Sequence, residues 1–197
     1  VGKAKLKSGN HKFFFLDLTG FDGRCDAVYI TSHKDDVPQE KCDAGWREKL
    51  NPRRTTEGKF DFVVVGGGIA GMCAAVTAAR LGLRVALVND RPVWGGNNSS
   101  EVRVHLGGNI EMGANKGLGR LIREFGPEKG GNAQPSSFYE DSKKEYFLKA
   151  EKNITLYPGF RAVGVVMNGE KIASVSAVNI ESGDKLLLSA PLFADCT

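Results

Sequence analysis

The stretch Phe60–Gly96, FDFVVVGGGIAGMCAAVTAARLGLRVALVNDRPVWGG, decides the fold. Its first apolar run, Phe62–Val65, is too short and too rich in β-branched residues for a helix, so it predicts a buried strand. Glycines follow at the spacing G-x-G-x-x-G, then an alanine-rich helical segment over residues 70–81 and a second apolar run, Val85–Val88. A strand, a glycine turn, a helix and a second strand in this order are typical of a dinucleotide-binding unit.

Three glycines and the start of the predicted helix give this motif its chemistry. Gly66 allows a tight turn after the strand, Gly68 lets a pyrophosphate approach the backbone, and Gly71 lets the helix pack on the strand. From Ala70 onward the helix offers free N–H groups and the positive end of its dipole, which favour an anion. The motif therefore predicts a diphosphate site.

The composition narrows the class of protein. The 197 residues suffice for one medium domain with part of another, and a hydrophobic content of 41% supports a packed core. The 27 basic and 23 acidic residues are interspersed, which argues against a nucleic-acid-binding surface. No apolar run approaches the length of a membrane span. We therefore expect a small-molecule substrate as the partner, with no nucleic acid and no membrane span.

The four cysteines have no spacing typical of a metal site, so no metal is predicted. Cys73 lies in the glycine-motif helix and is expected in the core, whereas Cys25 and Cys42 would pair only in an exported protein. The chain begins at Val1 and stops at Thr197 after an apolar run. We expect a fragment, and a missing signal peptide then leaves the compartment open.

Three segments are predicted. Residues 1–34 contain two strand candidates, 12–18 and 26–31, and two strands cannot bury a core alone. We therefore expect the C-terminal strands of a separate all-β module, although a hairpin leading into the main domain stays open. Residues 35–59 form a polar linker with Trp46 as its one large anchor, and residues 60–197 form the nucleotide-binding domain.

The second strand of the glycine unit ends at Asn89, followed by Asp90 and Arg91. Dinucleotide folds usually have an acid at this place, which hydrogen-bonds the ribose hydroxyls. Asn89 occupies the acid's place, and an amide also bonds hydroxyls, so either Asn89 or Asp90 holds the ribose. Asp90 would repel a 2′-phosphate, and Arg91 would partly offset that repulsion.

The C-terminal half has helices and then strands. Residues 117–125 show a helical apolar stripe, and Ser137 to Glu140 read as a capping box that opens a second helix to about Lys152. Asn168-Gly169 is a strong hairpin signal. Strands are expected over residues 154–157, 162–167, 171–180, 185–189 and 191–197. The second, third and fourth of these form a three-stranded meander with its hairpin.

Three stretches carry a family resemblance. LDLTGFDGRCDAVYIT at residues 16–31, DRPVWGGNNSSEVRVH at 90–105, and the final strand ending in D-x-T resemble large bacterial FAD-dependent oxidoreductases, which often occur beside polysaccharide-degrading systems. The resemblance implies an α/β class: a Rossmann-like FAD-binding domain of the glutathione-reductase type, with a parallel sheet, the glycine-motif helix and the inserted three-stranded β-meander. The tail of an all-β module precedes it.

The resemblance also implies site residues. Gly95 and Gly96 would let the backbone approach the flavin chain, and Ala162 sits where a backbone contact to adenine is usual. Asn97, Ser99 and Arg103 offer donors for the phosphates and ring. The substrate region of the family normally follows these motifs, so no catalytic residue is assigned. His105 is a candidate base or a structural residue. The expected cofactor-binding set is Gly66, Gly68, Ala70, Gly71, Asn89, Asp90, Arg91, Gly95, Gly96, Asn97, Ser99, Arg103 and Ala162.

The implied function is transfer of hydride or electrons between flavin and an unidentified small organic or carbohydrate-related substrate. An NAD(P)-dependent dehydrogenase would use the same glycines. A carbohydrate-associated binding module in residues 1–34 and a non-redox flavin enzyme are further alternatives. The polysaccharide setting makes export to the periplasm or the exterior an expectation, and the oligomeric state stays open.

Overall fold

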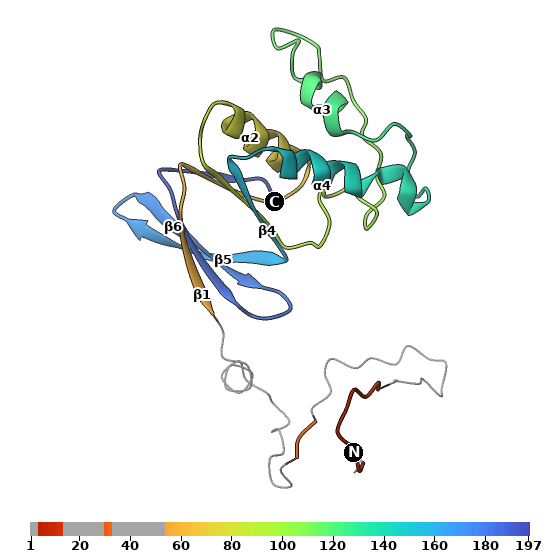
Figure 1. Ribbon diagram of the computed structural model, residues 1–197. Helices are drawn as coiled ribbons and strands as arrows, with labels where there is room; N and C mark the ends of the chain where they lie inside the picture. The colour runs from red at the N-terminus through yellow and green to blue at the C-terminus, as the bar shows by residue number, and fades with distance from the viewer. Residues whose placement is uncertain (1–3, 14–29, 33–53) are drawn as a thin grey trace. The chain divides into compact units, whose positions relative to one another are not determined.

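The computed structural model describes residues 4–13, 30–32 and 54–197 (Figure 1). The chain divides into two compact units, residues 1–47 and 48–197. This boundary lies inside the predicted linker, residues 35–59. The strand candidates at 12–18 and 26–31 lie almost wholly outside the described residues, as do Trp46, Cys25 and Cys42.

A four-stranded parallel sheet forms the centre of the second unit. Its strand order is β4-β3-β2-β8, and helix α2 (Ile69–Arg80) connects β2 to β3. The predicted strand–glycine turn–helix–strand unit is therefore confirmed. The bounds of the strands are Phe62–Val65 for β2, Val85–Asn89 for β3, Ile154–Pro158 for β4 and Leu192–Asp195 for β8.

A second sheet has the order β1-β7-β6-β5. The antiparallel neighbours β5, β6 and β7 confirm the predicted three-stranded meander with its turn at Asn168-Gly169. Strand β1 pairs in parallel with β7 over five residue pairs. The bounds are Thr55–Lys59 for β1, Phe160–Asn168 for β5, Lys171–Asn179 for β6 and Lys185–Ser189 for β7.

Strand β1 corrects one prediction, because it occupies the last five residues of the expected linker. The sequence Thr-Thr-Glu-Gly-Lys has no apolar alternation, and four of its five residues are exposed. Backbone pairing with β7 forms this edge strand, and hydrophobic periodicity does not report such pairing.

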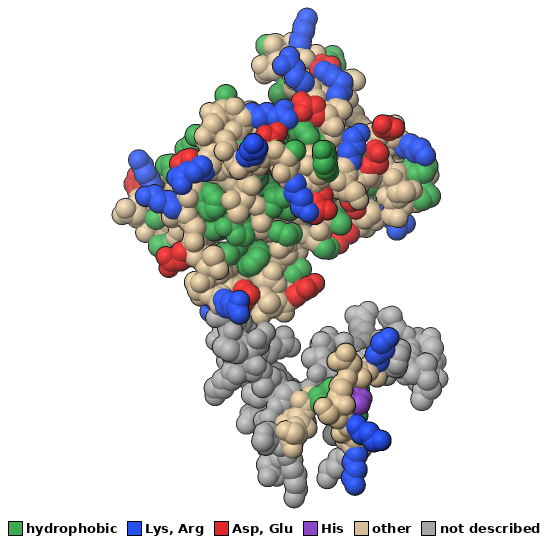
Figure 2. All heavy atoms as spheres, viewed as in Figure 1, with side chains coloured by type: hydrophobic (Ala, Val, Ile, Leu, Met, Phe, Trp, Pro, Cys, Tyr) green, Lys and Arg blue, Asp and Glu red, His purple; other side chains and the backbone are tan. Residues whose placement is uncertain are grey.

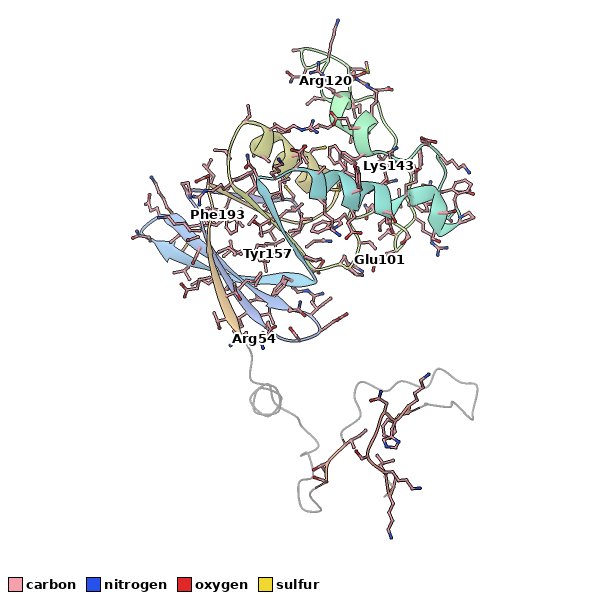
Figure 3. All side chains as sticks on the ribbon, in the orientation of Figure 1. Arg54, Glu101, Arg120, Lys143, Tyr157 and Phe193 are labelled. Atoms are coloured by element: carbon pink, nitrogen blue, oxygen red, sulfur yellow. The ribbon has the colours of Figure 1, made fainter. Side chains whose placement is uncertain are left out.

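The second unit has three layers. Alternate residues of β2 and β3 face opposite ways, as strand geometry requires. Val63, Ala86 and Val88 pack against the meander sheet, with Tyr157 and Phe193 at the border of this cluster (Figure 3). Val64 and Leu87 pack with α2 and the other helices, which lie on the opposite side (Figure 1). The whole of β3 is buried, because both of its faces are covered.

Two further helices agree in part with the predicted ones. The helix expected over residues 117–125 is confirmed as α3 (Gly119–Phe125). The capping box at Ser137–Glu140 is wrong: a 3₁₀ turn (Ser136–Tyr139) precedes α4 (Asp141–Ala150), and no side chain caps α4. Glu140 separates the two with a φ of 45°, and its Oε2 accepts a hydrogen bond from the N–H of Glu128 at 2.7 Å.

The surface of the second unit mixes both signs of charge. Figure 2 shows basic and acidic side chains interspersed over the face in view, with apolar side chains between them. Among the described residues, no helix is long and apolar enough to cross a bilayer.

Candidate cofactor site

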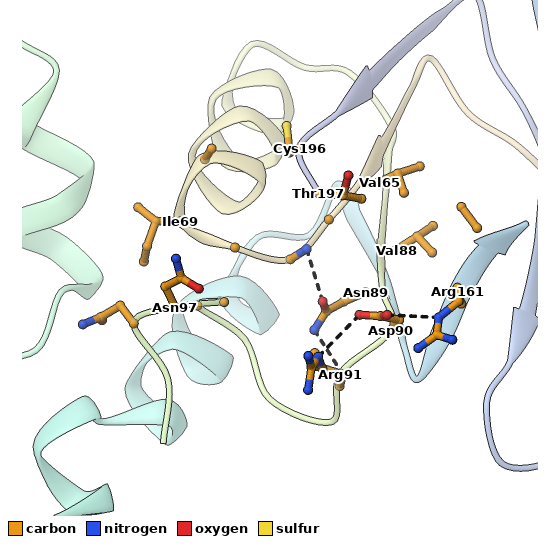
Figure 4. Close-up of a pocket in the computed structure, with 18 of the residues that line it drawn as sticks. Val65, Ile69, Val88, Asn89, Asp90, Arg91, Asn97, Arg161, Cys196 and Thr197 are labelled. Carbon is orange, nitrogen blue, oxygen red and sulfur yellow. Dashed lines mark hydrogen bonds and ion pairs between the residues drawn. The ribbon is translucent and has the colours of Figure 1, made fainter. Parts of the chain in front are cut away.

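A cavity of about 510 Å³ lies at the carboxyl ends of β2, β3 and β8 (Figure 4). Strand β3 lies on one side of β2 and β8 on the other, and open parallel sheets bind ligands in the crevice at such a switch point. The volume falls in the range of roughly 300–1,000 Å³ that is usual for cofactor sites. Two segments form its main walls: the glycine turn, residues 66–71, and the cavity loop, residues 89–105.

The glycines of the glycine turn have different tasks. Gly66 has a φ of +106°, which only glycine adopts without strain. A Cβ on Gly71 would overlap the carbonyl oxygen of Gly66, so Gly71 is required for the packing of α2 on its strand. A Cβ on Gly68 would meet no protein atom closer than the Cα of Gly96, at 4.0 Å. Protein packing does not require a glycine at position 68, but close approach of a ligand does.

The N-terminus of α2 is suited to an anion. Gly68, Ile69 and Ala70 line the cavity where the helix begins. Among the described residues, no side chain caps this end, and the first turn contains no acid. Its free N–H groups and the positive end of the dipole are therefore available to a diphosphate.

The cavity loop begins with two polar residues that behave differently. Asn89 is 7% exposed, and its amide joins three backbone segments by accepting from Gly67 and donating to Arg91 and Val93. Asp90 is more exposed, and its Oδ2 lies 3.2 Å from the Nε of Arg161 (Figure 4).

Glycines also bring the two walls together. The N–H of Gly95 donates to the carbonyl of Gly67 at 2.8 Å, and Gly68 and Gly95 form a parallel bridge. A Cβ on Gly96 would lie 3.0 Å from the Cα of Gly68. Gly95 and Gly96 both have positive φ, at 111° and 57°. The backbones of the two walls thus approach each other with no side chain between them.

A buried lysine supports the cavity loop from the protein side. Lys144 of α4 is fully buried, and its Nζ donates to the carbonyl of Tyr139 and lies 4.0 Å from Oδ1 of Asp141. A Cβ on Gly95 would lie 2.8 Å from the Cδ of Lys144. Burial lowers the pKa of Lys144, and the carboxylate of Asp141 partly opposes that shift.

Two further contacts fix the loop to the start of α4 and to the 3₁₀ turn before it. The N–H of Ser100 donates to the carboxylate of Asp141 at 3.1 Å. The hydroxyl of the buried Tyr139 lies 2.6 Å from the carbonyl oxygen of Arg103. The backbone of Arg103 has a φ of 62°, so this contact holds a turn that is strained for a non-glycine residue.

Most of the residues predicted from sequence come together here. The predicted residues that line the cavity are Gly66, Gly68, Ala70, Asn89, Asp90, Arg91, Gly95, Gly96, Asn97 and Ala162. The structure places three others elsewhere. Gly71 lies inside α2, the Oγ of the buried Ser99 accepts from Glu101, and the Nε of Arg103 donates to the carbonyl of Ser100. His105 lines the cavity with its Nδ1 3.2 Å from Oδ1 of Asn132.

Sequence reasoning missed three polar residues of the cavity, Asn98, Arg161 and Thr197. Arg161 adjoins Ala162, so the alignment that indicated Ala162 could have found it. Asn98 follows Asn97, and nothing in the sequence distinguishes the two amides. Asn98 is 2% exposed and donates to the carbonyl of Val104 at 2.9 Å. Its Oδ1 is the one buried side-chain polar atom in the described part of the chain without a hydrogen-bond partner.

These features fit a dinucleotide cofactor. The position of Gly68 leaves space for a close backbone approach, the uncapped α2 suits a diphosphate, and the orphaned acceptor of Asn98 lies at the wall of the same cavity. Gly68, Ala70 and Gly96 would hold the pyrophosphate. In the described ranges, no group of three or more His, Cys, Asp or Glu residues is arranged to hold a metal.

Comparison with known proteins identifies the cofactor. The family model described as FAD dependent oxidoreductase matches residues 61–197. Glycerol-3-phosphate dehydrogenase of Mycobacterium leprae is 41% identical over 71 residues, which cover 36% of this chain and 11% of that protein. Glycerol-3-phosphate dehydrogenase 2 of Mycobacterium tuberculosis is 44% identical over 50 residues, covering 25% and 8%. The chain thus matches about a tenth of the length of these curated relatives.

Solved structures support the fold. Adenylylsulfate reductase from Archaeoglobus fulgidus superimposes with a TM-score of 0.55 at 15% identity, over 74% of this chain and 31% of that one. The family model covers well over half of the 197 residues. Because the family uses FAD, it favours FAD over a nicotinamide cofactor for the glycine unit. The chain belongs to the FAD dependent oxidoreductase family, and its cofactor is FAD.

Proposed function

We propose that the protein to which this chain belongs transfers hydride or electrons between the flavin of FAD and a small organic or carbohydrate-related substrate. The observation that supports this most directly is the open space in front of the Cα of Gly68, at the uncapped N-terminus of α2. FAD supplies the redox chemistry when bound, and the protein supplies binding, orientation and electrostatics.

The described residues bind and orient the cofactor in this proposal. Backbone N–H groups at the start of α2 stabilise the negative charge of the diphosphate, and Gly95 and Gly96 of the cavity loop lie on its other side. Lys144, Asp141 and Tyr139 keep the loop in place from behind. A structure that is ordered before the cofactor arrives reduces the entropic cost of binding.

The substrate stays an open part of the proposal. The name glycerol-3-phosphate dehydrogenase belongs to relatives of which this chain matches about a tenth, so it does not assign that substrate here. A carbohydrate-related substrate and export from the cytoplasm rest on the family resemblance of the sequence. Cell fractionation of the source organism, followed by immunodetection, would test export.

The first test is an absorbance spectrum of the purified protein, with the released cofactor identified by mass. Flavin bands near ~370 and ~450 nm and a released mass equal to FAD are expected. A colourless protein that also fails to take up added FAD would contradict the proposal. As a control, the Gly68→Val variant should purify without the bands.

A second measurement separates redox from non-redox flavin chemistry. Candidate substrates, beginning with sugars and sugar alcohols, are added without oxygen, and loss of the ~450 nm band reports reduction of the flavin. Product formation with the band unchanged, and with no dependence on an electron acceptor, would favour a non-redox flavin enzyme instead.

A further inference from the structure

Asn89 and Asp90 are adjacent, polar and both at the cavity, yet one of the two is already committed to the protein itself. We infer that Asp90, supported by Arg161, binds the ribose hydroxyls of the adenosine part of FAD. Asn89, at the place where this fold usually has the ribose-binding acid, is then a positioning residue for the glycine turn and the cavity loop. The inference rests on the FAD site of the proposed function.

The hydrogen bonds of Asn89 leave it no free donor. Its Nδ2 donates to the carbonyl oxygens of Arg91 at 3.1 Å and Val93 at 2.9 Å. An amide nitrogen has two N–H donors, and both are used. Its Oδ1 accepts from the N–H of Gly67 at 3.3 Å. Reversing the amide would point an oxygen at two carbonyl oxygens, so the pattern has one orientation.

The packing around Asn89 leads to the same conclusion. The side chain is 7% exposed. A Cβ on Gly67 would lie 2.6 Å from the Cγ of Asn89 and 2.7 Å from the ring of Trp94. Asn89 is therefore enclosed between the glycine turn and the loop. A carboxylate at this position would have no donor for the carbonyls of Arg91 and Val93, which explains the amide in place of the acid.

Asp90 has the capacity that Asn89 lacks. Its side chain is 37% exposed, and its nearest cations are Arg161 at 3.2 Å and Arg91 at 3.9 Å. A carboxylate has about four acceptor sites, so positions remain for two hydroxyl donors. The two neighbouring hydroxyls of a ribose can donate one hydrogen bond to each carboxylate oxygen. Figure 4 shows Asp90 and Arg161 on the same side of the cavity.

Arg161 connects Asp90 to the part of the cavity where the resemblance places adenine. It lies in β5 directly before Ala162, which also lines the cavity. The ion pair therefore joins the end of β3 to the start of β5. Arg161 orients the carboxylate, while Asp90 is the group that touches the ribose.

The test compares nucleotides that differ by one hydroxyl. The unaltered 197-residue chain is titrated with ADP, 2′-deoxy-ADP and 3′-deoxy-ADP in a calorimeter. ADP has the ribose and the diphosphate without the flavin, so its binding depends on the cavity described above. Because a hydrogen bond to a charged group is lost, at least one deoxy nucleotide should bind about 10-fold more weakly than ADP.

Variants then assign the effect to a residue. Asp90→Ala should weaken ADP binding by about 10- to 100-fold and bring ADP and the weaker-binding deoxy nucleotide to within about 2-fold of each other. Arg161→Gln should weaken ADP by a few-fold but keep the preference over the deoxy nucleotide. Asp61→Ala is the matched control, because Asp61 is also 37% exposed and paired with an arginine, Arg84, but does not line the cavity.

The outcomes separate the inference from the FAD site itself. Equal binding of all three nucleotides by the unaltered chain would overturn the ribose assignment and leave the FAD site standing. A preference for ADP that survives in a folded Asp90→Ala variant would also overturn it and assign the ribose to another group. If the unaltered chain binds neither ADP nor FAD, the proposed cofactor site fails, and the inference fails with it.

Discussion

The two walls of the cavity are built on opposite principles. The glycine turn, residues 66–71, positions its backbone through missing side chains, and each added Cβ has a definite consequence. The cavity loop, residues 89–105, is positioned by side chains, chiefly those of Asn89, Tyr139, Asp141 and Lys144. The first wall is therefore specified locally, whereas the second depends on residues that are distant in sequence.

This difference predicts two kinds of failure. A change in the glycine turn either unfolds the domain or blocks the ligand, depending on what lies in front of the glycine. A change in the cavity loop moves a wall that is held by individual hydrogen bonds, each of which contributes about 1 kcal/mol. The predictions below range from the largest expected effect to the smallest.

The largest effect is expected at Gly71. Gly71→Val introduces a Cβ that overlaps the carbonyl oxygen of Gly66, so α2 must move away from its strand. We expect a loss of about 3 kcal/mol in the free energy of unfolding. Urea denaturation followed by circular dichroism measures it, with Gly82→Ala as a control, since no atom lies within 4 Å of its Cβ and only its φ of +92° adds strain. Equal losses in the two variants would contradict the role of Gly71 in packing.

Gly68→Val should separate folding from binding. Its Cβ meets no protein atom within 4.0 Å, so the melting temperature should stay close to that of the unaltered chain. FAD affinity should fall by at least about 100-fold, since the valine side chain would occupy the space through which the diphosphate approaches the backbone. Fluorescence titration with FAD measures the affinity. A folded variant that still copurifies with FAD would show that the diphosphate lies elsewhere.

Asn89→Asp tests the second wall by restoring the acid that this fold usually has. The carboxylate would lose both donors to the carbonyls of Arg91 and Val93. We expect a loss of about 2 kcal/mol in stability and weaker FAD binding rather than stronger. Thermal melts with and without FAD measure both. Tighter FAD binding in this variant would mean that Asn89 holds the ribose.

Lys144→Met should have the smallest effect and depend on pH. The pKa of Lys144 is lowered in the folded state, so below about 10.4 the unfolded chain binds more protons, and stability rises with pH in that window. Removing the lysine removes this contribution. Melting temperatures between about pH 7.5 and 10 should rise less steeply in the variant, and the difference between the two curves isolates Lys144 from other groups. Parallel curves would show that Lys144 contributes no proton uptake on unfolding.

The comparison also explains what the sequence could predict. Strands β2 and β3, helix α2 and the meander follow from apolar runs, glycine spacing and a hairpin signal, all of which are local. The same local pattern indicated six of the residues that line the cavity, and the family resemblance indicated the other four, Gly95, Gly96, Asn97 and Ala162. These features were predictable because their physical cause lies within a few residues of the element.

The remainder depends on contacts between distant segments. Strand β1 exists through pairing with β7, which is 130 residues away in sequence. The role of Asn89 depends on the carbonyls of Arg91 and Val93, and the same loop is bound to α4 at Ser100. The side chain of Lys144 is buried against Gly95. A basic residue within a helix is usually exposed, so the sequence gives no reason to expect its burial. Such assignments require the fold first and the side-chain environment second.

The parallel pairing of β1 with β7 has a mechanical consequence. A pull on the chain ahead of Thr55 acts along β1 and loads its five residue pairs in shear, so that they resist together instead of opening one at a time. The bond from the N–H of Phe60 to Ser189 extends this clamp to the residue two positions before β2. Tension from the N-terminal side is therefore borne by the meander sheet, and the glycine turn that faces the cofactor is shielded from it.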